Sequence, residues 1–280
     1  MQALHLDLAP GRRFALWWRP DGPVRRLVVH AHAFAEEMNK SRRMVALQAR
    51  ALVADGAAVL VPDLHGCGDS EGEFVDARWS IWIDDLLSAC AWGRRELARS
   101  GSAGPGLECW LWGHRLGALI ATAAIARSDE AFNLLLWQPA VQGRMTSQQF
   151  LRLDGAAGLI GRSGADGRPS AKALLAAGQP ARIAGYEVSP ELMQSIAAAQ
   201  LDPPERPGRL VWIDVAADLT VPSSPVVQTA LQAWRSAGWR TTHERVEGAP
   251  FWQTTEIECV PALLECTRRA LAAPAAEDAR

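Results

Sequence analysis

Residues 110–120 read Trp-Leu-Trp-Gly-His-Arg-Leu-Gly-Ala-Leu-Ile, and this short stretch decides the fold. The residues up to 112 predict a buried strand, and residues 116–127 predict a helix. Gly113 and Gly117 flank the turn between them, where small residues allow the backbone to turn sharply and to pack closely. Such a turn exposes its central side chain at the end of the strand, and that side chain belongs to Arg115.

On both sides of this turn, strands alternate with helices along the chain. The first 20 residues predict a hairpin. Further strands are predicted at residues 26–30, 58–62, 109–112, 132–137, 209–215 and 240–246, and helices at 41–55, 79–97, 116–127, 225–237 and 255–271. This alternation predicts an α/β fold with a mostly parallel sheet that helices cover on both faces.

Residues 139–207 interrupt the alternation. Glycine recurs at every third position from Gly155 to Gly167, which predicts a flexible surface segment. Ser189, Pro190 and Glu191 then predict the start of a helix, because they suit its cap, its first position and its positive end. We therefore expect a core of residues 1–138 and 208–273, a small lid insertion at 139–207 and a flexible tail at 274–280. The lid should lie over the carboxyl ends of the sheet, where ligands bind.

The composition excludes several classes of protein. Of the 280 residues, 49% are apolar and 21% are charged, which excludes disorder as the main state. The net charge of −2 excludes a strong field for nucleic acid or an anionic membrane. The five cysteines have no CxxC spacing, so we expect no disulfide scaffold, no metal and no cofactor. We see no membrane span or secretory signal, and we expect a cytoplasmic protein.

Four segments resemble those of the α/β hydrolases. The turn at residues 113–117 resembles their G-x-S-x-G turn, and His32-Ala33-Phe34 resembles the H-G-x segment that supplies an oxyanion-hole N–H. Residues 63–72 resemble the loop D-x-x-G-x-G-x-S-x-G, and Asp218 follows the late strand where the acid of the triad usually lies. The resemblance runs from about Arg26 to the last helix and implies an α/β-hydrolase fold.

A narrower resemblance rests on three other segments. Residues 34–44, residues 136–139 with 148–152, and residues 250–255 resemble a signature of the exosortase A system-associated hydrolase 2 family. Members of this family are linked to bacterial loci for exopolysaccharide production and for sorting proteins with a PEP-CTERM tail. The resemblance implies that proteins of the polysaccharide and sorting machinery are partners of this chain.

The catalytic triad is degenerate in this sequence. Arg115 occupies the position of the nucleophile, and Phe251 occupies the expected position of the histidine, so Asp218 is the one recognisable member. Without an imidazole no base activates a nucleophile, and without a hydroxyl or thiol no acyl-enzyme forms. A guanidinium stays protonated and cannot attack a carbonyl.

We therefore predict binding of a small anionic or acyl-type ligand in place of triad catalysis. The guanidinium of Arg115 could clamp a carboxylate or phosphate, helped by the N–H groups at the helix start. The competing interpretation is that Arg115 pairs with Asp218 or Glu36 and closes a dead site. The candidate ligand-binding residues are Phe34, Glu36, His114, Arg115, Leu116, Asp218 and Trp252.

An active hydrolase or acyltransferase with a displaced nucleophile is the alternative function. Cys67 is a candidate nucleophile with His65 nearby, and His243 is a candidate base on the last strand. The structural interpretations are a buried inert thiol and a strand histidine that faces solvent or a neighbour. Asp69 and Ser70 are expected to hold their loop together through local hydrogen bonds. Trp110, Trp112, Trp137 and Trp212 are expected in the core.

Overall fold

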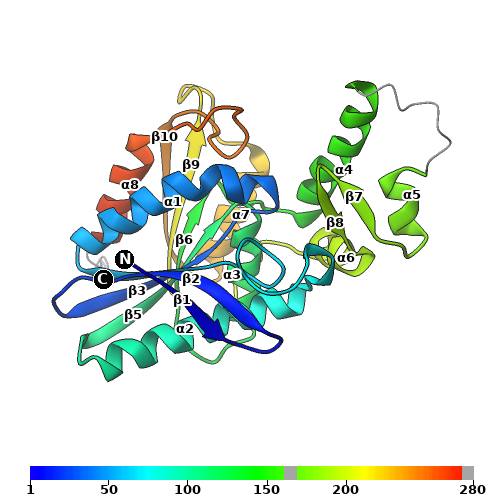
Figure 1. The fold of residues 1–280 in the computed structure, drawn as a ribbon. Helices are drawn as coiled ribbons and strands as arrows, with labels where there is room; N and C mark the ends of the chain where they lie inside the picture. The colour runs from blue at the N-terminus through cyan, green and yellow to red at the C-terminus, as the bar shows by residue number, and fades with distance from the viewer. Residues whose placement is uncertain (161–168, 273–280) are drawn as a thin grey trace.

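The computed structural model describes residues 1–160 and 169–272, and an eight-stranded sheet forms its centre (Figure 1). The strands lie in the order β1-β2-β4-β3-β5-β6-β9-β10. β2 is antiparallel to both of its neighbours, and the other adjacent strands are parallel. Their bounds are β1 Gln2–Asp7, β2 Arg12–Trp18, β3 Val24–Ala31, β4 Ala57–Pro62, β5 Ala103–His114, β6 Asn133–Trp137, β9 Arg209–Ala216 and β10 Arg240–Glu247.

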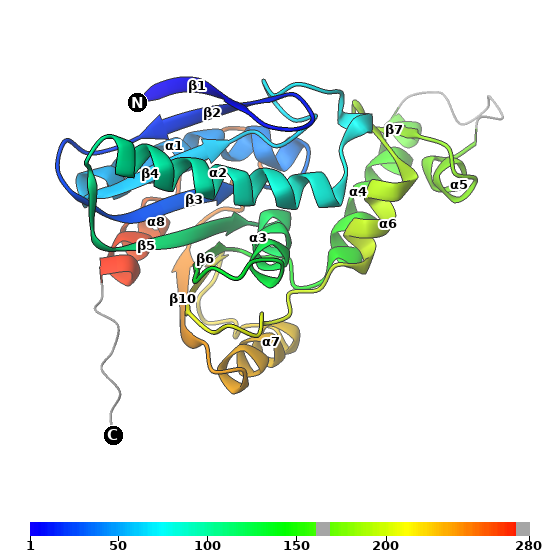
Figure 2. The ribbon, with the colours of Figure 1, turned by 90° about the horizontal axis from the view of Figure 1, so that it is seen from below.

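Helices cover both faces of this sheet. α1 and α8 pack on one face, and α2, α3 and α7 pack on the other (Figures 1 and 2). Their bounds are α1 Glu36–Ala54, α2 Trp79–Arg99, α3 Leu116–Ala126, α7 Pro225–Ser236 and α8 Pro261–Ala272. The predicted α/β-hydrolase fold is thus confirmed, and the initial hairpin is formed by β1 and β2. None of the helices in the described ranges is long and apolar enough to cross a membrane.

The sheet is central because its inner strands are apolar on both sides. All six residues of β4 are buried, as expected for a strand that helices or loops cover on each face. The four strand tryptophans predicted for the core are fully buried, and these are Trp110, Trp112, Trp137 and Trp212.

Two predicted helix starts are wrong. α1 begins at Glu36 and not at Ser41, after Ala35 turns the chain with a φ of 51°. No side chain caps this helix, so the usual signal for an N-terminus is missing. α8 begins at Pro261 and not near Thr255, and the residues from 255 to 260 are not helical. Proline suits the first position of a helix because its missing N–H needs no partner there.

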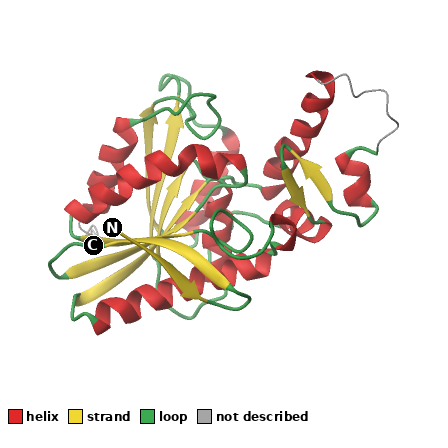
Figure 3. Ribbon diagram, in the orientation of Figure 1, coloured by secondary structure: helices red, strands yellow, loops and turns green. Residues whose placement is uncertain are grey.

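The chain between β6 and β9 forms a separate group of elements beyond the carboxyl ends of the central strands (Figures 2 and 3). We call residues 139–207 the insertion. It contains α4 Gly143–Ile160, α5 Ala171–Ala176, β7 Ala181–Ile183, β8 Tyr186–Val188 and α6 Pro190–Ala198. Ser189 caps α6 by accepting a hydrogen bond from the Leu192 N–H, as predicted.

The glycine-rich part of the insertion differs from its prediction. The backbone at Gly155 and Gly158 is helical and belongs to α4, so this part is not an irregular loop. The prediction for Gly161, Gly164 and Gly167 lies outside the described residues.

The two chains that connect the insertion to the core pair with each other. The Gly143 N–H donates to the Ala199 carbonyl at 2.9 Å, and the Leu201 N–H donates to the Val141 carbonyl at 3.0 Å. Between these bonds, Gln142 and Gln200 form an antiparallel bridge. We call this pairing the clasp, and it holds the beginning and the end of the insertion side by side.

The loop from residue 63 to 72 is held by polar contacts near its ends. The Ser70 hydroxyl donates to the Asp63 carbonyl and accepts from the Phe14 N–H. The Asp69 N–H donates to a carboxylate oxygen of Asp63, so it is the backbone of Asp69 that ties the loop.

A buried ion pair joins β2 to α2 next to this loop. The Arg13 Nε donates to Asp85 at 2.8 Å, and both side chains are almost fully buried, at 0% and 2% exposed. The same carboxylate accepts from the His65 N–H, and Arg13 also donates to the Pro10 carbonyl.

Candidate functional site

The sharp turn between β5 and α3 has the predicted form. Arg115 stands between the strand and the helix with φ 55° and ψ −116°, in a region that residues with a side chain seldom adopt. A Cβ on Gly113 would collide with the backbone of Ala118, and one on Gly117 would collide with the carbonyl of Ala31. Glycine is required at both positions because the helix start packs directly against the ends of β3 and β5.

The side chain of Arg115 pairs with Glu37, which corrects the predicted partners. Its Nε and Nη2 lie 3.3 to 3.4 Å from the Glu37 carboxylate. Its guanidinium also lies over the ring of Trp252, 5.5 Å from the centroid. Arg115 is 13% exposed and Glu37 is 20% exposed, so the pair is screened from solvent but not sealed.

Neither of the two predicted acids reaches Arg115. Asp218 lies in an exposed turn, where its carboxylate accepts hydrogen bonds from the N–H and the hydroxyl of Thr220. These bonds lower the pKa of Asp218. Glu36 instead accepts hydrogen bonds from Asn39 and from the hydroxyl of Tyr186, which belongs to the insertion. The prediction that Arg115 would pair with Asp218 or Glu36 is therefore wrong.

Two cavities meet at the Arg115–Glu37 pair. The large cavity measures about 650 Å3 and lies between α1, the loop after β10 and the insertion. It is lined by Phe34, Ala35, Glu36, Glu37, Lys40, Thr146, Gln149, Phe150, Leu153, Ala184, Trp252 and Gln253. The small cavity measures about 270 Å3 and includes Arg115 itself, with residues of α4 and the start of α7. Thr146 and Gln149 of α4 line both cavities.

The backbone beside this pair offers two further donors. The N–H groups of Phe34 and Leu116 make no hydrogen bond to any described residue. Leu116 is the first residue of α3, where helical N–H groups have no internal partner and carry partial positive charge. The α/β-hydrolase resemblance assigns an oxyanion-hole N–H to the segment of Phe34, and in that fold the residue after the centre of the turn, here Leu116, supplies the other.

The expected histidine position is filled by an aromatic group. Phe251 is buried in the loop after β10, and its ring stacks on His114 with centroids 5.3 Å apart. His114 is fully buried, and neither of its ring nitrogens has a hydrogen-bond partner among the described residues. Burial holds the pKa of His114 well below its usual value, so the ring is neutral. Both side chains lie below the turn and act as packing.

The candidates for a displaced nucleophile and base are not in reactive settings. Cys67 is buried, and burial raises the pKa of its thiol, whereas a reactive thiol needs a lowered pKa. Burial lowers the pKa of His65, the histidine near Cys67 in the sequence. His243 lies on β10, and its Nε2 bonds to Asp214 at 2.9 Å. The structural interpretations of Cys67 and His243 are thus the ones that the geometry supports.

Sequence reasoning missed the polar residues that join the site together. The amide of Gln253 donates to Glu37, and Lys40 donates to the carbonyl of Gln253. Glu37 was not among the predicted ligand-binding residues, although an acid in the first turn of α1 faces the neighbouring start of α3. Thr146 had no signal, and Gln149 appeared only within the segment 148–152 of the narrower resemblance, because only the fold of the insertion brings both residues to the cavity of Arg115.

The described residues offer no metal centre. Within residues 1–160 and 169–272, no group of three His, Cys, Asp or Glu side chains could hold a metal ion. The chemistry available at the site is that of one guanidinium, two carboxylates, one ammonium group, backbone donors and aromatic walls.

Comparison with known families gives a match over more than half of the chain. A family model described as Hydrolase_4, serine aminopeptidase S33, matches residues 22–200. The matched range contains β3, the turn at Arg115 and most of the insertion. A search of curated proteins found no match.

Solved structures share the fold at low sequence identity. Est1E from Butyrivibrio proteoclasticus, solved with ferulic acid bound, has a TM-score of 0.63 and 16% identity, over 96% of this chain and 98% of that one. XC6422 from Xanthomonas campestris, described as an α/β serine hydrolase without a lid, has a TM-score of 0.55 and 19% identity, over 98% and 96%. Mouse α/β hydrolase domain-containing protein 10 has a TM-score of 0.56 and 16% identity, over 97% of each chain. At these identities the likeness shows the fold alone.

Proposed function

The chain belongs to the Hydrolase_4 family (serine aminopeptidase, S33) of α/β hydrolases, and from this membership we propose that it binds a small anionic, acyl-type ligand at Arg115. In this proposal it does not hydrolyse esters through a Ser-His-Asp triad. A guanidinium stands at the sharp turn, and a phenyl ring stands in the loop after the last strand. The first stays protonated and the second accepts no proton, so neither can carry out acyl transfer.

The observation that carries the proposal is the incomplete pairing of Arg115. Charge-assisted hydrogen bonds are usually about 2.7–2.9 Å long, whereas the contacts of Arg115 with Glu37 measure 3.3 to 3.4 Å. The Nη1 group has no hydrogen-bond partner among the described residues. The guanidinium therefore keeps donors for a carboxylate or phosphate, and the start of α3 favours an anion at the same place.

The walls of the large cavity suit the apolar part of such a ligand. Phe34, Phe150, Leu153 and Trp252 line it, and they would cover an acyl chain. Lys40 also lines the large cavity. Its ammonium group donates to the carbonyl of Gln253, and it has no acidic partner among the described residues. An amphipathic anion would place its head at Arg115 or Lys40 and its chain along the aromatic walls.

The biological setting stays a prediction from the narrower resemblance. Segments 34–44 and 250–255, which carry part of that resemblance, each contribute residues to the lining of the large cavity. We propose that the ligand, or a protein that presents it, belongs to the polysaccharide and PEP-CTERM sorting machinery. The proposal places the chain in the cytoplasm.

The alternative is an active hydrolase or acyltransferase with a displaced nucleophile. It would need a reactive group close to a cavity, and the burial of Cys67 together with its raised pKa opposes that candidate. This alternative is kept as an outcome of the second experiment below.

The binding proposal is tested with three probes of equal chain length: decanoate, decanol and decyltrimethylammonium. Isothermal titration calorimetry should give the highest affinity for decanoate. Arg115→Gln should weaken decanoate by about tenfold or more, since a hydrogen bond to a charged group is lost. Glu37→Gln should tighten it, because the competing carboxylate is gone. Arg43→Gln, at an exposed arginine of α1 that lines neither cavity, is the matched control and should change nothing.

The catalytic alternative is tested by labelling. Fluorophosphonate and iodoacetamide probes should not label the folded protein stoichiometrically at one residue. The protein should also not hydrolyse p-nitrophenyl esters at about 1 s⁻¹, which is within the ordinary range of enzyme turnover rates. Turnover that Cys67→Ala or His243→Ala abolishes would replace the binding proposal. Equal affinity of the protein for decanoate, decanol and decyltrimethylammonium would also reject the binding proposal.

A further inference from the structure

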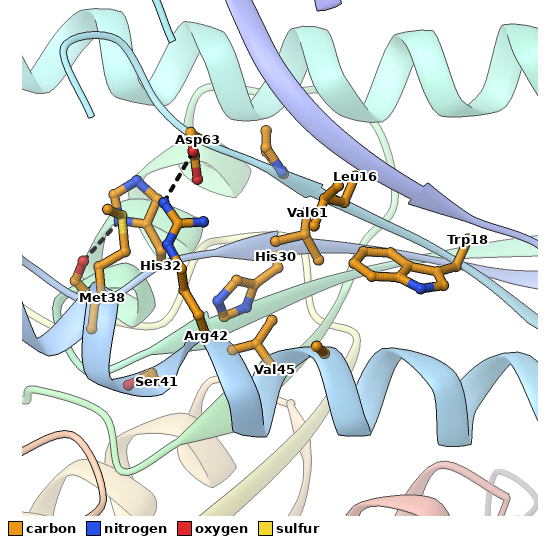
Figure 4. A pocket seen from close by; sticks show the side chains of 13 residues that line it. Leu16, Trp18, His30, His32, Met38, Ser41, Arg42, Val45, Val61 and Asp63 are labelled. Atoms are coloured by element: carbon orange, nitrogen blue, oxygen red, sulfur yellow. Dashed lines mark hydrogen bonds and ion pairs between the residues drawn. The ribbon is translucent and has the colours of Figure 1, made fainter. Parts of the chain in front are cut away.

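A second binding region lies between α1 and the sheet, away from Arg115 (Figure 4). We call it the α1 cavity. Its volume is about 200 Å3, and it is enclosed by β2, by the ends of β3 and β4 and by the first half of α1. It shares no lining residue with the large or the small cavity.

The walls of the α1 cavity are mainly apolar. Leu16, Val45 and Val61 line it, and Figure 4 shows Val61 and Val45 on opposite sides of the His30 ring. Most lining residues are buried, but Leu16, Arg42 and Ala46 are half-buried. These three residues therefore mark the opening between β2 and α1.

One wall presents a hydrogen-bond acceptor whose state is fixed. The Nδ1 of His30 lies 3.0 Å from the carbonyl of Trp112, and a carbonyl only accepts, so Nδ1 carries the hydrogen. Burial lowers the pKa of His30 to about 3, so the ring is neutral. Its Nε2 therefore keeps a free lone pair, and no described residue donates to it.

Another lining residue, Trp18, can report on the state of the cavity. The indole Nε1 of Trp18 is buried and has no hydrogen-bond partner among the described residues. Figure 4 shows the His30 ring between Trp18 on one side and Arg42 on the other.

The charges at the α1 cavity disfavour an ionic ligand. Arg42 pairs with Asp63 at 3.1 Å, so a cation would approach a guanidinium and an anion would approach a buried carboxylate. Burying either ion without a partner of its own is expensive. A neutral molecule avoids both costs.

We propose that the α1 cavity binds a small neutral alcohol or phenol. Its hydroxyl donates to Nε2 of His30, and its apolar body packs among Leu16, Val45 and Val61. The size is suitable, because an apolar cavity of about 150 Å3 is large enough for benzene. A six-membered ring with one hydroxymethyl group fills the α1 cavity without crowding.

The test uses four probes that differ in one group: benzyl alcohol, toluene, benzoate and benzylammonium. We expect benzyl alcohol to bind the full chain with one-to-one stoichiometry and to shift the indole N–H resonance of Trp18, which Trp18→Phe assigns. One net hydrogen bond predicts a preference of about fivefold over toluene. Neither benzoate nor benzylammonium should shift that resonance, and any benzoate binding at Arg115 should be lost in Arg115→Gln.

Three variants locate the site. Ala46→Phe should block the opening and abolish the shift, whereas Ala51→Phe, also at a half-buried alanine of α1 but outside the cavity, should keep it. His30→Asn keeps a donor for the Trp112 carbonyl but removes Nε2, so the preference for benzyl alcohol over toluene should disappear. The proposal is overturned if neither neutral probe shifts the Trp18 resonance. It is overturned equally if both bind alike in the wild type, or if Ala46→Phe leaves binding intact.

Discussion

Two arginine–carboxylate pairs of this molecule differ in burial and in geometry. The Arg13–Asp85 pair is almost fully buried, and its shortest contact is 2.8 Å. The Arg115–Glu37 pair is partly exposed, and its contacts are 3.3 Å or longer. The first has further bonds to a carbonyl and a backbone N–H, and the one Arg13 donor without a partner among the described residues, Nη2, is buried; the second keeps Nη1 unused beside two cavities.

The difference shows what each pair is suited to do. A buried pair with additional hydrogen bonds fixes one arrangement of β2, α2 and the loop at His65, because removing either partner leaves an unpaired charge. A loose pair near solvent costs little to separate, so a ligand can take one of its members. Geometry, and not residue type, therefore distinguishes an arginine that fixes the fold from one whose guanidinium keeps donors free.

The largest expected effect concerns the tight pair. Asp85→Asn should lower the free energy of unfolding by about 3–5 kcal/mol, because Arg13 would stay buried without a countercharge. Denaturant titration measures the change. Asp84→Asn, at the neighbouring residue whose ion pair with Arg127 is exposed, is the matched control and should cost less than about 1 kcal/mol. Similar losses in both variants would remove the contrast between buried and exposed pairs.

A second prediction concerns four histidines whose imidazole rings are buried. The pKa values of His30, His32, His65 and His114 are all lowered, in each case mainly by burial. Well above pH 6.5 these rings are neutral in both the folded and the unfolded chain. Below it the unfolded chain binds protons that the folded chain does not, so the free energy of unfolding falls as the pH falls.

The size of this effect can be stated for one ring. With a pKa of about 3 in the folded state, His30 alone should remove about 2 kcal/mol between pH 6.5 and pH 5. Denaturant titration at a series of pH values should show this fall, and His30→Asn should make it shallower. A free energy of unfolding that rises from pH 6.5 to pH 5 would contradict the prediction.

A smaller gain is expected beneath the Arg115 pair. His114→Phe should raise the free energy of unfolding by about 1 kcal/mol at pH 7.5, because two unpaired ring nitrogens leave the core while the stacking on Phe251 is kept. His243→Phe is the contrasting control, since its imidazole bonds to Asp214 and its removal should lower stability. Thermal unfolding of both variants measures the two changes. A lower stability of His114→Phe would contradict the prediction, because it would mean that the imidazole stabilises the fold.

The smallest effect concerns the loose pair. Glu37→Gln should change the free energy of unfolding by less than about 1 kcal/mol, although it removes the only carboxylate bound to Arg115 among the described residues. The same variant should strengthen decanoate binding. A loss as large as that of Asp85→Asn would show that Arg115 and Glu37 form a structural pair.

Most of the fold could be predicted because local patterns and the chain order agree. The apolar runs gave the strands, Gly113 and Gly117 gave the sharp turn, and Ser189 with Pro190 gave the start of α6. These signals depend on the backbone and on neighbouring residues, which a sequence displays directly.

The partner of Arg115 could not be predicted for the same reason. α1 begins after Ala35, whose positive φ and lack of a capping side chain leave no signal at that position. The early start places Glu37 opposite Arg115. The local bonds of Asp218 with Thr220 keep that acid in its own turn, and no pattern along the chain indicates which of two acids a distant arginine will meet.

The clasp at the base of the insertion has a consequence for how this protein could have diverged. Because Gln142 and Gln200 pair with each other, the two ends of the segment between them are held together by the clasp and not by the segment itself. A segment of this kind can be lengthened, shortened or exchanged in one recombination event while the sheet and the Arg115 turn keep their geometry. The specificity of the large cavity, to which the insertion contributes Thr146, Phe150 and Leu153, can therefore change faster than the core that supports it.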